Sequence, residues 1–462
     1  MVRFKLPDDL GALDELMLKG DSEPTTRPYM SLVLVLSRPP SAARLEAAFT
    51  RALGSVPRMR QRVARSSWTG GRASWVDDEA FDLSYHLRRV GAPGDRTLAA
   101  ALAGASAIST APLDPARPLW EAVVVERLVD GRALLIVRAH HAIADGVRGI
   151  EMMAALLDLE PSPAEPPSHT DVDEQCHVLR PEAAQMLRGL ARVWVSNPRR
   201  ASSWYWSLVR TSRRPVKAIS ESTSYVRSAF RTVDRGDAAP SPLVANRSSA
   251  RRYAALQIPL DAMKATAQAH GATVNDVYLA ALLGGWRRYH EAFGLPAADV
   301  PLALPIDVPG TRHHEAGNHI SAAIIPGPAS ISEPAERLSA VHRLVLSRRA
   351  EPGLGAVDHL APTLRQVSPQ IAIAVLGAHA RRVDLQASNL MGPPCPVYTA
   401  GEKVEGMYAF GPLPGLPVMA VLISYEGVCS IGLTLDPAAV TDIELFVACL
   451  HEGFDEVLGS TT

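Results

Sequence analysis

Two apolar runs separated by a turn sequence mark the middle of the N-terminal region. The first covers residues 122–125, and the second covers residues 131–139, directly after Asp130. Because Asp-Gly between two apolar runs favours a tight turn, these residues predict a β-hairpin. Apolar residues then recur at the spacing of one helix face, at Val147, Ile150, Met153 and Leu157. The pattern therefore predicts a buried strand followed, after Gly146, by a helix.

The same patterns predict further elements on both sides of this hairpin. Residues 29–36 are typical of a strand, and residues 42–53 of a helix that begins after the N-cap Ser41. Beyond residue 250 we predict a strand at 253–258, helices at 261–270 and 273–289, and apolar strands at 418–424 and 431–435 that end the chain.

The length of the chain predicts more than one domain, because 462 residues exceed what one ordinary core holds. We assign residues 1–159 to a first domain and residues 250–462 to a second. Residues 160–249 are predicted to link them, with a proline-rich start at 160–170, a mostly helical segment at 181–214 and an irregular stretch at 220–249.

Composition narrows the class of protein. Hydrophobic residues make up 47% and charged residues 21%, which favours a globular chain with a large core. The formal net charge of −1 gives no support to a nucleic-acid partner. The four cysteines lack CxxC spacing, which argues against a zinc site and a disulfide framework. The N-terminal residues lack the apolar core of a signal peptide, and no apolar run spans a bilayer, so we expect a cytoplasmic protein.

Two adjacent histidines, His140 and His141, stand where the predicted strand gives way to the helix. Consecutive strand residues point to opposite faces, so we expect one imidazole to pack and the other to face a cleft. A neutral imidazole can accept a proton from a hydroxyl group. Asp145 could orient an imidazole, and Gly146 permits a close approach. The alternative is that both histidines are core or turn residues and that Asp145 only caps the helix.

A second candidate group lies at the predicted helix 273–289. Thr273 and Asp276 have the spacing of a capping box, which places Asn275 in the first helical turn. An amide at that position can donate a hydrogen bond to a developing oxyanion. The alternative is that Asn275 and Asp276 only cap the helix, and for Asp276 we favour this structural role.

The segment H-H-x-x-x-D-G resembles the signature of the coenzyme-A-dependent acyltransferases, which include chloramphenicol acetyltransferases and peptide-synthetase condensation domains. Further segments, in order, resemble the bacterial wax ester synthase/diacylglycerol acyltransferase family over nearly the whole chain: residues 118–121, Asn275-Asp276, Gly317-Asn318, and Ser388-Asn389 with Gly392-Pro393. The resemblance implies an α/β (α+β) fold of two acetyltransferase-like domains. Each domain would be a mixed sheet flanked by helices, with an active-site tunnel between them.

The resemblance also implies an activity. It points to an acyl-CoA-dependent O-acyltransferase that esterifies diacylglycerol or a long-chain alcohol, giving triacylglycerol or wax ester. His141 would be the general base and Asn275 the oxyanion donor, while His140, Asp145 and Gly146 would hold the geometry. The chain has no G-x-S-x-G elbow, so direct transfer without an acyl-enzyme is expected. Acyl-CoA is the co-substrate, and no metal or other cofactor is expected.

Two other readings of the same residues stay open. One is a catalytically silent protein that binds lipid or acyl-CoA, and the other is an acyltransferase whose donor is carried on a carrier protein. Departures from the family pattern are what the sequence offers in favour of the catalytically silent alternative. Met391 stands where the family has proline, and residues 304–308 replace a P-V-S-x-R pattern, so substrate selectivity could differ. Residues 388–393 themselves are predicted to form a turn.

The histidine-rich residues 313–319 do not predict a metal site. An H-E-x-x-H site needs histidine at position 318, where the chain has Asn318, and Gly317 disfavours the helix that such a site requires. We therefore expect no metalloprotease-type centre here.

A basic, aromatic segment covers residues 188–217 and contains no acidic residue. Tryptophan and arginine favour the headgroup region of a membrane or lipid droplet, so we expect peripheral association there. The alternative is an ordinary helix whose aromatic residues pack on the protein. The residues named for the interface are Trp194, Trp204, Trp206, Arg210 and Arg213. The sequence leaves the oligomeric state open.

Overall fold

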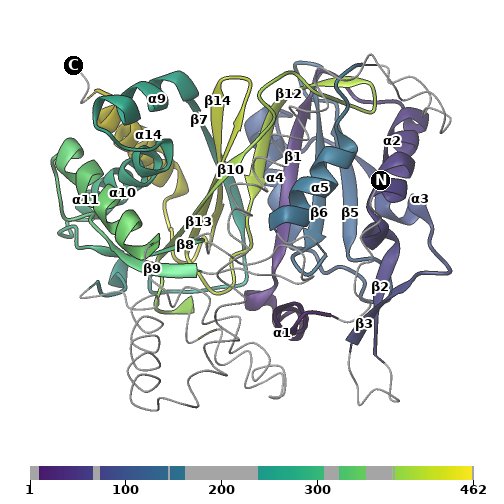
Figure 1. Cartoon of the computed structure of the whole chain (residues 1–462), viewed down its shortest axis with the longest axis horizontal. Coiled ribbons are helices and arrows are strands. Elements are labelled where there is room, and N and C mark those ends of the chain that lie inside the picture. The colour runs from purple at the N-terminus through teal and green to yellow at the C-terminus, as the bar shows by residue number, and fades with distance from the viewer. Residues whose placement is uncertain are drawn as a thin grey trace, which may run out of the picture.

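The computed structural model describes residues 10–65, 73–143, 146–161, 238–305, 322–349, 377 and 380–459. Two sheets with their helices stand side by side, one built mainly from the N-terminal residues and one from the C-terminal residues (Figure 1). We call them the first half and the second half.

The first half begins with helix α1 and alternates strands with helices. Its elements are α1 (Ala12–Gly20), β1 (Tyr29–Leu36), α2 (Ala42–Ser55), β2 (Gln61–Arg65), β3 (Ala73–Asp77), α3 (Leu83–His86), β4 (Leu87–Gly91), α4 (Leu98–Thr110), β5 (Trp120–Glu126), β6 (Ala133–His140) and α5 (Gly146–Leu156). Strands β5 and β6 pair antiparallel, so the predicted hairpin is confirmed. Every residue of β6 is buried, and accordingly residues 133–137 are apolar without alternation, while the buried Arg138 pairs with Glu121 of β5.

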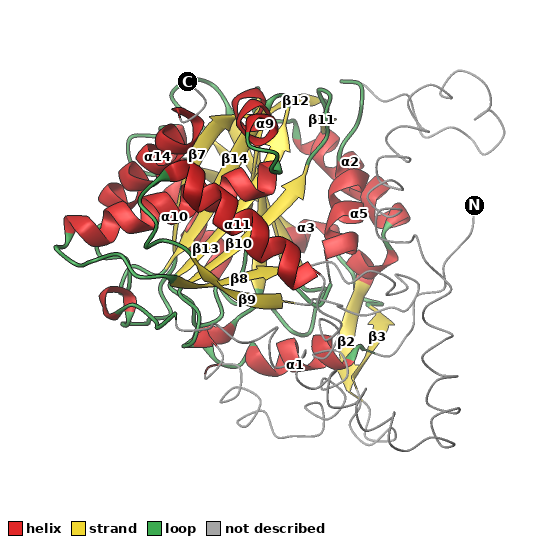
Figure 2. Cartoon of the chain, turned by 60° about the vertical axis from the view of Figure 1, so that its left-hand side comes forward, coloured by secondary structure: helices red, strands yellow, loops and turns green. Residues whose placement is uncertain are grey.

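The C-terminal residues supply the remaining described α-helices and strands, and of these β11 and β12 belong to the first sheet. These helices and strands are β7 (Arg252–Pro259), α9 (Leu260–Ala269), α10 (Val274–Ala292), β8 (Val300–Pro305), β9 (Ala322–Gly327), α11 (Pro334–Arg349), β10 (Leu385–Met391), β11 (Tyr398–Thr399), β12 (Glu402–Phe410), β13 (Val418–Tyr425), β14 (Val428–Leu435) and α14 (Ile443–Gly459). Helices α10, α11 and α14 lie over one face of the sheet of the second half (Figure 2). The predicted strands and helices between residues 253 and 435 are confirmed.

The strand orders show that the C-terminal part of the chain contributes two strands, β11 and β12, to the first sheet. Among the described strands, one sheet has the order β11-β12-β1-β6-β5-β4, another has the order β7-β14-β13-β10-β8-β9, and β2 and β3 pair as a separate two-stranded sheet. Strand β12 comes from the second half of the sequence but pairs antiparallel with β1, beside which it runs in Figure 1. Residues from the C-terminal part of the chain therefore complete the first sheet. The domain boundaries predicted at residues 159 and 250 remain predictions.

Two structural expectations were wrong. Residues 388–391 do not form a turn, because they are the end of β10 and pair parallel with residues 421–424 of β13. The chain also does not end in strands, since α14 follows β14 and buries Phe446, Leu450 and Phe454 against the second core. The helical spacing of these residues could have revealed α14, whereas the parallel pairing of β10 depends on a strand distant in sequence.

Several predicted features lie outside the described residues. They include the linker from 162 to 237 with its tryptophan-bearing segment, and residues 306–321 with the histidine-rich stretch. No helix in the described ranges combines the length and apolar content that a bilayer crossing requires.

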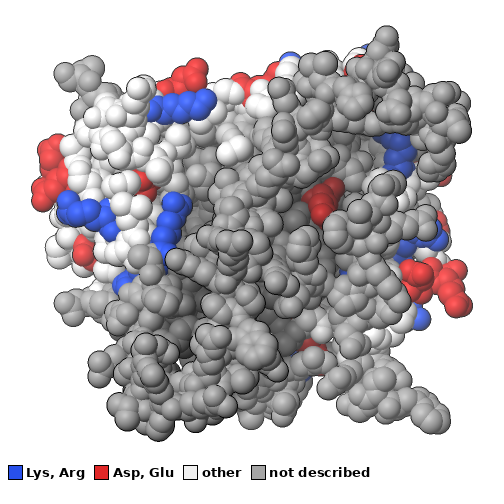
Figure 3. Space-filling view, in the orientation of Figure 1, with Lys and Arg blue, Asp and Glu red and all other residues white. Residues whose placement is uncertain are grey.

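On the face shown in Figure 3, the acidic and basic side chains of the described residues are interspersed.

Candidate functional site

The two histidines lie at the end of β6, where the strand passes into a turn. His140 is the last residue of β6, and its backbone N–H donates to the Leu119 carbonyl at 3.0 Å. The His141 N–H donates to the Pro28 carbonyl at 2.9 Å, and the N–H of Ile143 returns to the His140 carbonyl at 2.9 Å. The position of both histidines is therefore set by backbone bonds to two neighbouring segments.

The imidazole of His140 is enclosed by protein. Its exposed fraction is 0%, and its ring meets the Tyr29 ring edge-on with centroids 5.9 Å apart. The backbone N–H of Ala142 donates to its Nδ1 at 3.0 Å. Because that N–H can only donate, Nδ1 carries no proton and the ring is neutral. Burial, reinforced by the nearby His141, lowers the pKa of His140 to about 3.

His141 differs from His140 in its surroundings. It follows the strand, is only partly buried, and lies in the turn that precedes α5. Helix α5 begins at Gly146, as the helical spacing predicted. Asp145, the proposed partner of the histidines, lies outside the described residues. The structure thus encloses one imidazole and leaves the other partly accessible.

The second group of candidate residues lies at the start of α10. The Thr273 side chain accepts from the backbone N–H of Asp276 at 3.3 Å, and the Asp276 carboxylate accepts from the Thr273 N–H at 2.9 Å. The capping box expected from the sequence is therefore present. Asn275 occupies the first turn between these two residues, beside the free N–H groups of the helix terminus.

Two residues from other elements complete this group. His342 of α11 approaches Asp276, with its Nδ1 at 2.8 Å from Oδ2. Asn389 of β10 donates from Nδ2 to Oδ1 of Asn275 at 3.4 Å. The structure thus brings together Asn275, Asp276 and Asn389, three of the residues named from the sequence. His342 was missed, because only the packing of α11 against α10 places it there.

The other residues of the predicted motif have mixed positions. Ser388 lies within β10, and Pro393 follows that strand. Gly392 passes so close to β13 that a Cβ atom there would lie 2.2 Å from the Ser424 carbonyl oxygen, so this position requires glycine. Met391 is 55% exposed, and Gly317 and Asn318 lie outside the described residues.

A cavity of about 150 Å³ lies between the two halves. Arg27, Tyr29 and Ser109 line it from the first half, and Arg251 and Tyr253 line it from the second. Neither His141 nor Asn275 lines this cavity. Tyr29 is its one described link to the histidine pair, through the ring contact with His140.

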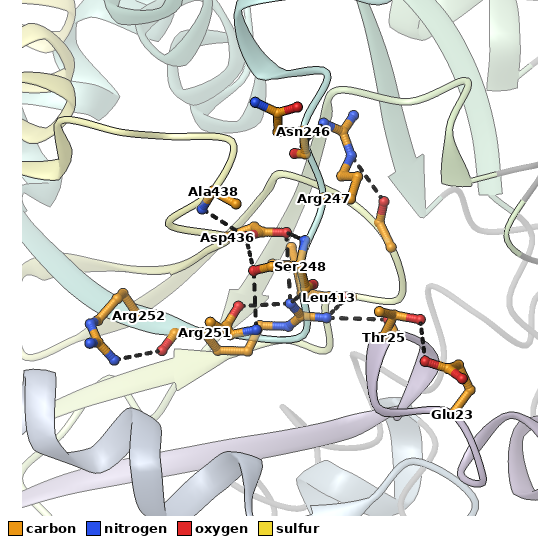
Figure 4. Close-up of polar contacts among 12 residues, drawn as sticks. Glu23, Thr25, Asn246, Arg247, Ser248, Arg251, Arg252, Leu413, Asp436 and Ala438 are labelled. Atoms are coloured by element: carbon orange, nitrogen blue, oxygen red, sulfur yellow. Dashed lines mark hydrogen bonds and ion pairs between the residues drawn. The ribbon is translucent and has the colours of Figure 1, made fainter.

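Arg251 ties the halves together beside this cavity. Its guanidinium donates to the carbonyls of Thr25 at 3.2 Å and Leu413 at 2.7 Å, so it bonds to both halves (Figure 4). The fully buried carboxylate of Asp436 lies 4.0 Å from the same guanidinium and accepts from the N–H and hydroxyl of Ser248, each at 2.5 Å. These charge-assisted bonds fix the segment that leads into β7.

Comparison with known proteins identifies the family. The family described as wax ester synthase/diacylglycerol acyltransferase catalytic domain matches residues 10–278, and its C-terminal domain matches residues 316–457. A Mycobacterium tuberculosis protein named as a diacylglycerol O-acyltransferase is 36% identical over 458 residues, which cover 98% of this chain and 92% of that protein. The chain belongs to the wax ester synthase/diacylglycerol acyltransferase family. A similarly named Mycobacterium bovis protein is 27% identical over 99% of this chain and 92% of its own length.

Solved structures confirm the fold of this family member. The wax ester synthase/diacylglycerol acyltransferase from Marinobacter aquaeolei VT8 superposes with a TM-score of 0.65 at 21% identity, covering 98% of this chain and 99% of its own. The first condensation domain of the calcium-dependent antibiotic synthetase gives a TM-score of 0.57 at 15% identity, covering 99% of this chain and 97% of its own. The predicted acetyltransferase-like fold is confirmed, and the protein is an acyltransferase of this family.

Proposed function

We propose that this protein transfers the acyl group of acyl-CoA to the hydroxyl of diacylglycerol or a long-chain alcohol, giving triacylglycerol or wax ester. The observation that carries the proposal is the histidine pair at the end of β6 in a chain of this family. His140 is enclosed and neutral, whereas His141 is partly accessible in the turn. Such a pair provides one imidazole for proton transfer and one that fixes the turn.

In this mechanism the His141 imidazole takes the proton from the acceptor hydroxyl as the oxygen attacks the thioester carbonyl. A tetrahedral intermediate forms, with the negative charge on the former carbonyl oxygen. When it collapses, the carbon–sulfur bond breaks and the imidazolium returns its proton to the coenzyme A thiolate. The thioester is already activated, so these reaction steps use no metal or prosthetic group and form no acyl-enzyme.

Asn275 supplies the oxyanion contact in this proposal. Its Oδ1 accepts from Asn389, so its Nδ2 has hydrogens left to donate. The positive end of the α10 dipole favours negative charge at the same place. Asp276 keeps a structural role through the capping box. His140, Asp145 and Gly146 hold the turn that positions His141.

The substrate class rests on relatives. The curated relatives are named for diacylglycerol, and a starter condensation domain of the same fold was solved with C8-CoA. Diacylglycerol and long-chain alcohols stay in membranes, so the enzyme must collect them at a lipid surface. We assign that docking to residues 188–217, with Trp194, Trp204 and Trp206 entering the headgroup region and the arginines attracted to anionic lipid.

The test is to incubate the purified protein with labelled palmitoyl-CoA and a panel of acceptors, then to resolve the lipids. Labelled triacylglycerol or wax ester supports the proposal, and the acceptor that is used separates diacylglycerol from alcohol specificity. Binding of palmitoyl-CoA without any product would favour a silent lipid-binding protein. Turnover only with acyl groups on a carrier protein would favour the carrier-dependent alternative.

Docking is tested with vesicles that contain anionic lipid. We expect co-sedimentation that weakens as salt is raised, because the Debye length falls to about 3 Å at 1 M ionic strength. The variant with Trp204→Ala and Trp206→Ala should release the fraction that persists at high salt. Binding that ignores both salt and these substitutions would show that residues 188–217 are an ordinary packed segment.

A further inference from the structure

The carboxylate of Asp276 is asymmetrically satisfied. Asp276 is 1% exposed, and its Oδ2 accepts from the Thr273 N–H at 2.9 Å, the Thr273 hydroxyl at 2.8 Å and Nδ1 of His342 at 2.8 Å. Its Oδ1 is buried and has no hydrogen-bond partner among the described residues. A buried polar atom without a partner is unfavourable, so each of the three hydrogen bonds to Oδ2 contributes to holding this carboxylate in place.

His342 is held in place by helix α11, which is fixed to α10. The fully buried Arg337 of α11 donates from Nε to the Ala280 carbonyl of α10 at 2.9 Å and forms an ion pair with Glu456 of α14. Leu338 and Val341 of α11 are buried in the same core. His342 follows directly after Val341, with 29% of its side chain exposed, so its imidazole reaches Asp276 from a rigid support.

We propose that His342 is a positioning residue for the acyl transfer: it holds Asp276 in the capping box and thereby fixes the oxyanion donor Asn275 at the first turn of α10. The inference rests on the proposed function of Asn275. Without the imidazole, Oδ2 loses a donor in a site that water barely reaches. The carboxylate then turns toward solvent, and the first turn of α10 loosens.

The effect reaches Asn275 because Asn275 is held from two sides. The capping box fixes its backbone, and Asn389 of β10 contacts its side chain at 3.4 Å. The contact from Asn389 is long and exposed, so it cannot alone replace a displaced backbone. Loss of His342 should therefore reduce the rate of the chemical step rather than the binding of acyl-CoA.

The experiment is a double-mutant cycle between His342→Ala and Asn275→Ala in the full-length protein. We expect His342→Ala to lower kcat about tenfold with the KM for palmitoyl-CoA within about twofold, because residues in one network couple by this order. In the Asn275→Ala background, the same change should lower kcat less than about twofold. His342→Asn keeps a donor where Nδ1 was, so it should restore most of the activity.

The matched control is His451→Ala, which removes an exposed imidazole from α14 and should leave kcat unchanged. If His342→Ala does not fold, His342→Gln is used in its place. The glutamine amide lies one bond farther from the backbone than the asparagine amide and so does not occupy the Nδ1 position. The loss of kcat expected for His342→Ala is therefore expected here too. A folded variant with normal kcat, or an equal loss in the Asn275→Ala background, would overturn the inference alone. A wild-type protein without transfer activity would overturn the proposed function and this inference together.

Discussion

The end of β6 and the start of α10 each bury an ionisable side chain, but different interactions stabilise the two side chains. At β6, the His140 ring is enclosed, accepts one backbone N–H, and is kept neutral, with its pKa lowered to about 3 by burial. At α10, the Asp276 carboxylate is equally enclosed but is held by donors from Thr273 and His342. At β6, burial keeps the imidazole neutral; at α10, hydrogen bonds from neighbouring groups hold the buried carboxyl side chain.

The difference follows from where the partners come from. The acceptor interaction of His140 lies within a turn of three residues, so the local chain sets it. The partners of the α10 terminus include residues of α11 and β10, which are distant in sequence. At β6 the distant contacts are backbone bonds and a ring contact, whereas at α10 they are side-chain hydrogen bonds to the candidate residues, so single side-chain substitutions in other elements should affect the α10 site more. The following predictions test this contrast, from the largest expected effect to the smallest.

The largest effect is expected at His141. Because a general base contributes about 10²–10⁴-fold, His141→Ala should lower kcat by that order with little loss of fold. His140→Ala should act through packing and stability instead, since the enclosed ring is neutral and unavailable. Kinetics and thermal unfolding of both variants separate these outcomes. Full activity in folded His141→Ala would refute the mechanism, and a purely catalytic loss in His140→Ala would reverse the two roles.

The next effect is expected at Asn275. Removing one oxyanion donor costs about 10²–10³-fold in kcat, so Asn275→Ala should show this loss with nearly unchanged affinity for acyl-CoA. Steady-state kinetics with palmitoyl-CoA measure both. Normal kinetics with a loss of about 1 kcal/mol in stability would assign Asn275 to capping alone.

Acid should destabilise the fold through His140. The unfolded chain binds a proton near the ordinary pKa of 6.5, whereas folded His140 does not until about pH 3, so stability falls as the pH drops below 6.5. Between pH 6.5 and about 5 the loss from this group approaches about 2 kcal/mol. Burial also lowers the pKa values of His86 and His290, which adds to the same trend.

His140→Asn isolates the contribution of this histidine. The asparagine Oδ1 can still accept from the Ala142 N–H but does not titrate. Denaturant unfolding at several pH values should show a smaller decline below pH 6.5 in His140→Asn than in the wild type. The control His451→Asn, at an exposed position, should keep the wild-type decline. Equal pH dependence in all three proteins would show that the enclosed ring takes up a proton without cost.

The smallest effect is expected at the cap itself. Thr273→Ala removes the side chain that accepts the Asp276 N–H and donates to its carboxylate, and should cost about 1 kcal/mol in the free energy of unfolding. Thr273→Ser keeps the hydroxyl and serves as the control. Because His342 still holds Asp276, kcat should fall less in Thr273→Ala than in His342→Ala. The opposite order would place the support of this turn in the local cap.

The sequence by itself determined the local structure of both sites. Apolar runs and the Asp-Gly turn predicted the β5–β6 hairpin, and the spacing of Thr273 and Asp276 predicted the capping box at α10. These features depend on interactions within a few residues, which a linear pattern records. Strand alternation predicted that the two histidines would meet different surroundings, and they do, but His141 lies in the turn after β6 rather than on the opposite face of the strand.

Only the tertiary structure decided what surrounds these local features. The parallel pairing of β10 with β13 turned a predicted turn into a strand, and the docking of α11 brought His342 to Asp276. Strand β12, from the C-terminal part of the sequence, pairs with β1 and so belongs to the first sheet. Such contacts join residues far apart in sequence, and their free energy comes from burial and pairing with partners that the local pattern does not specify.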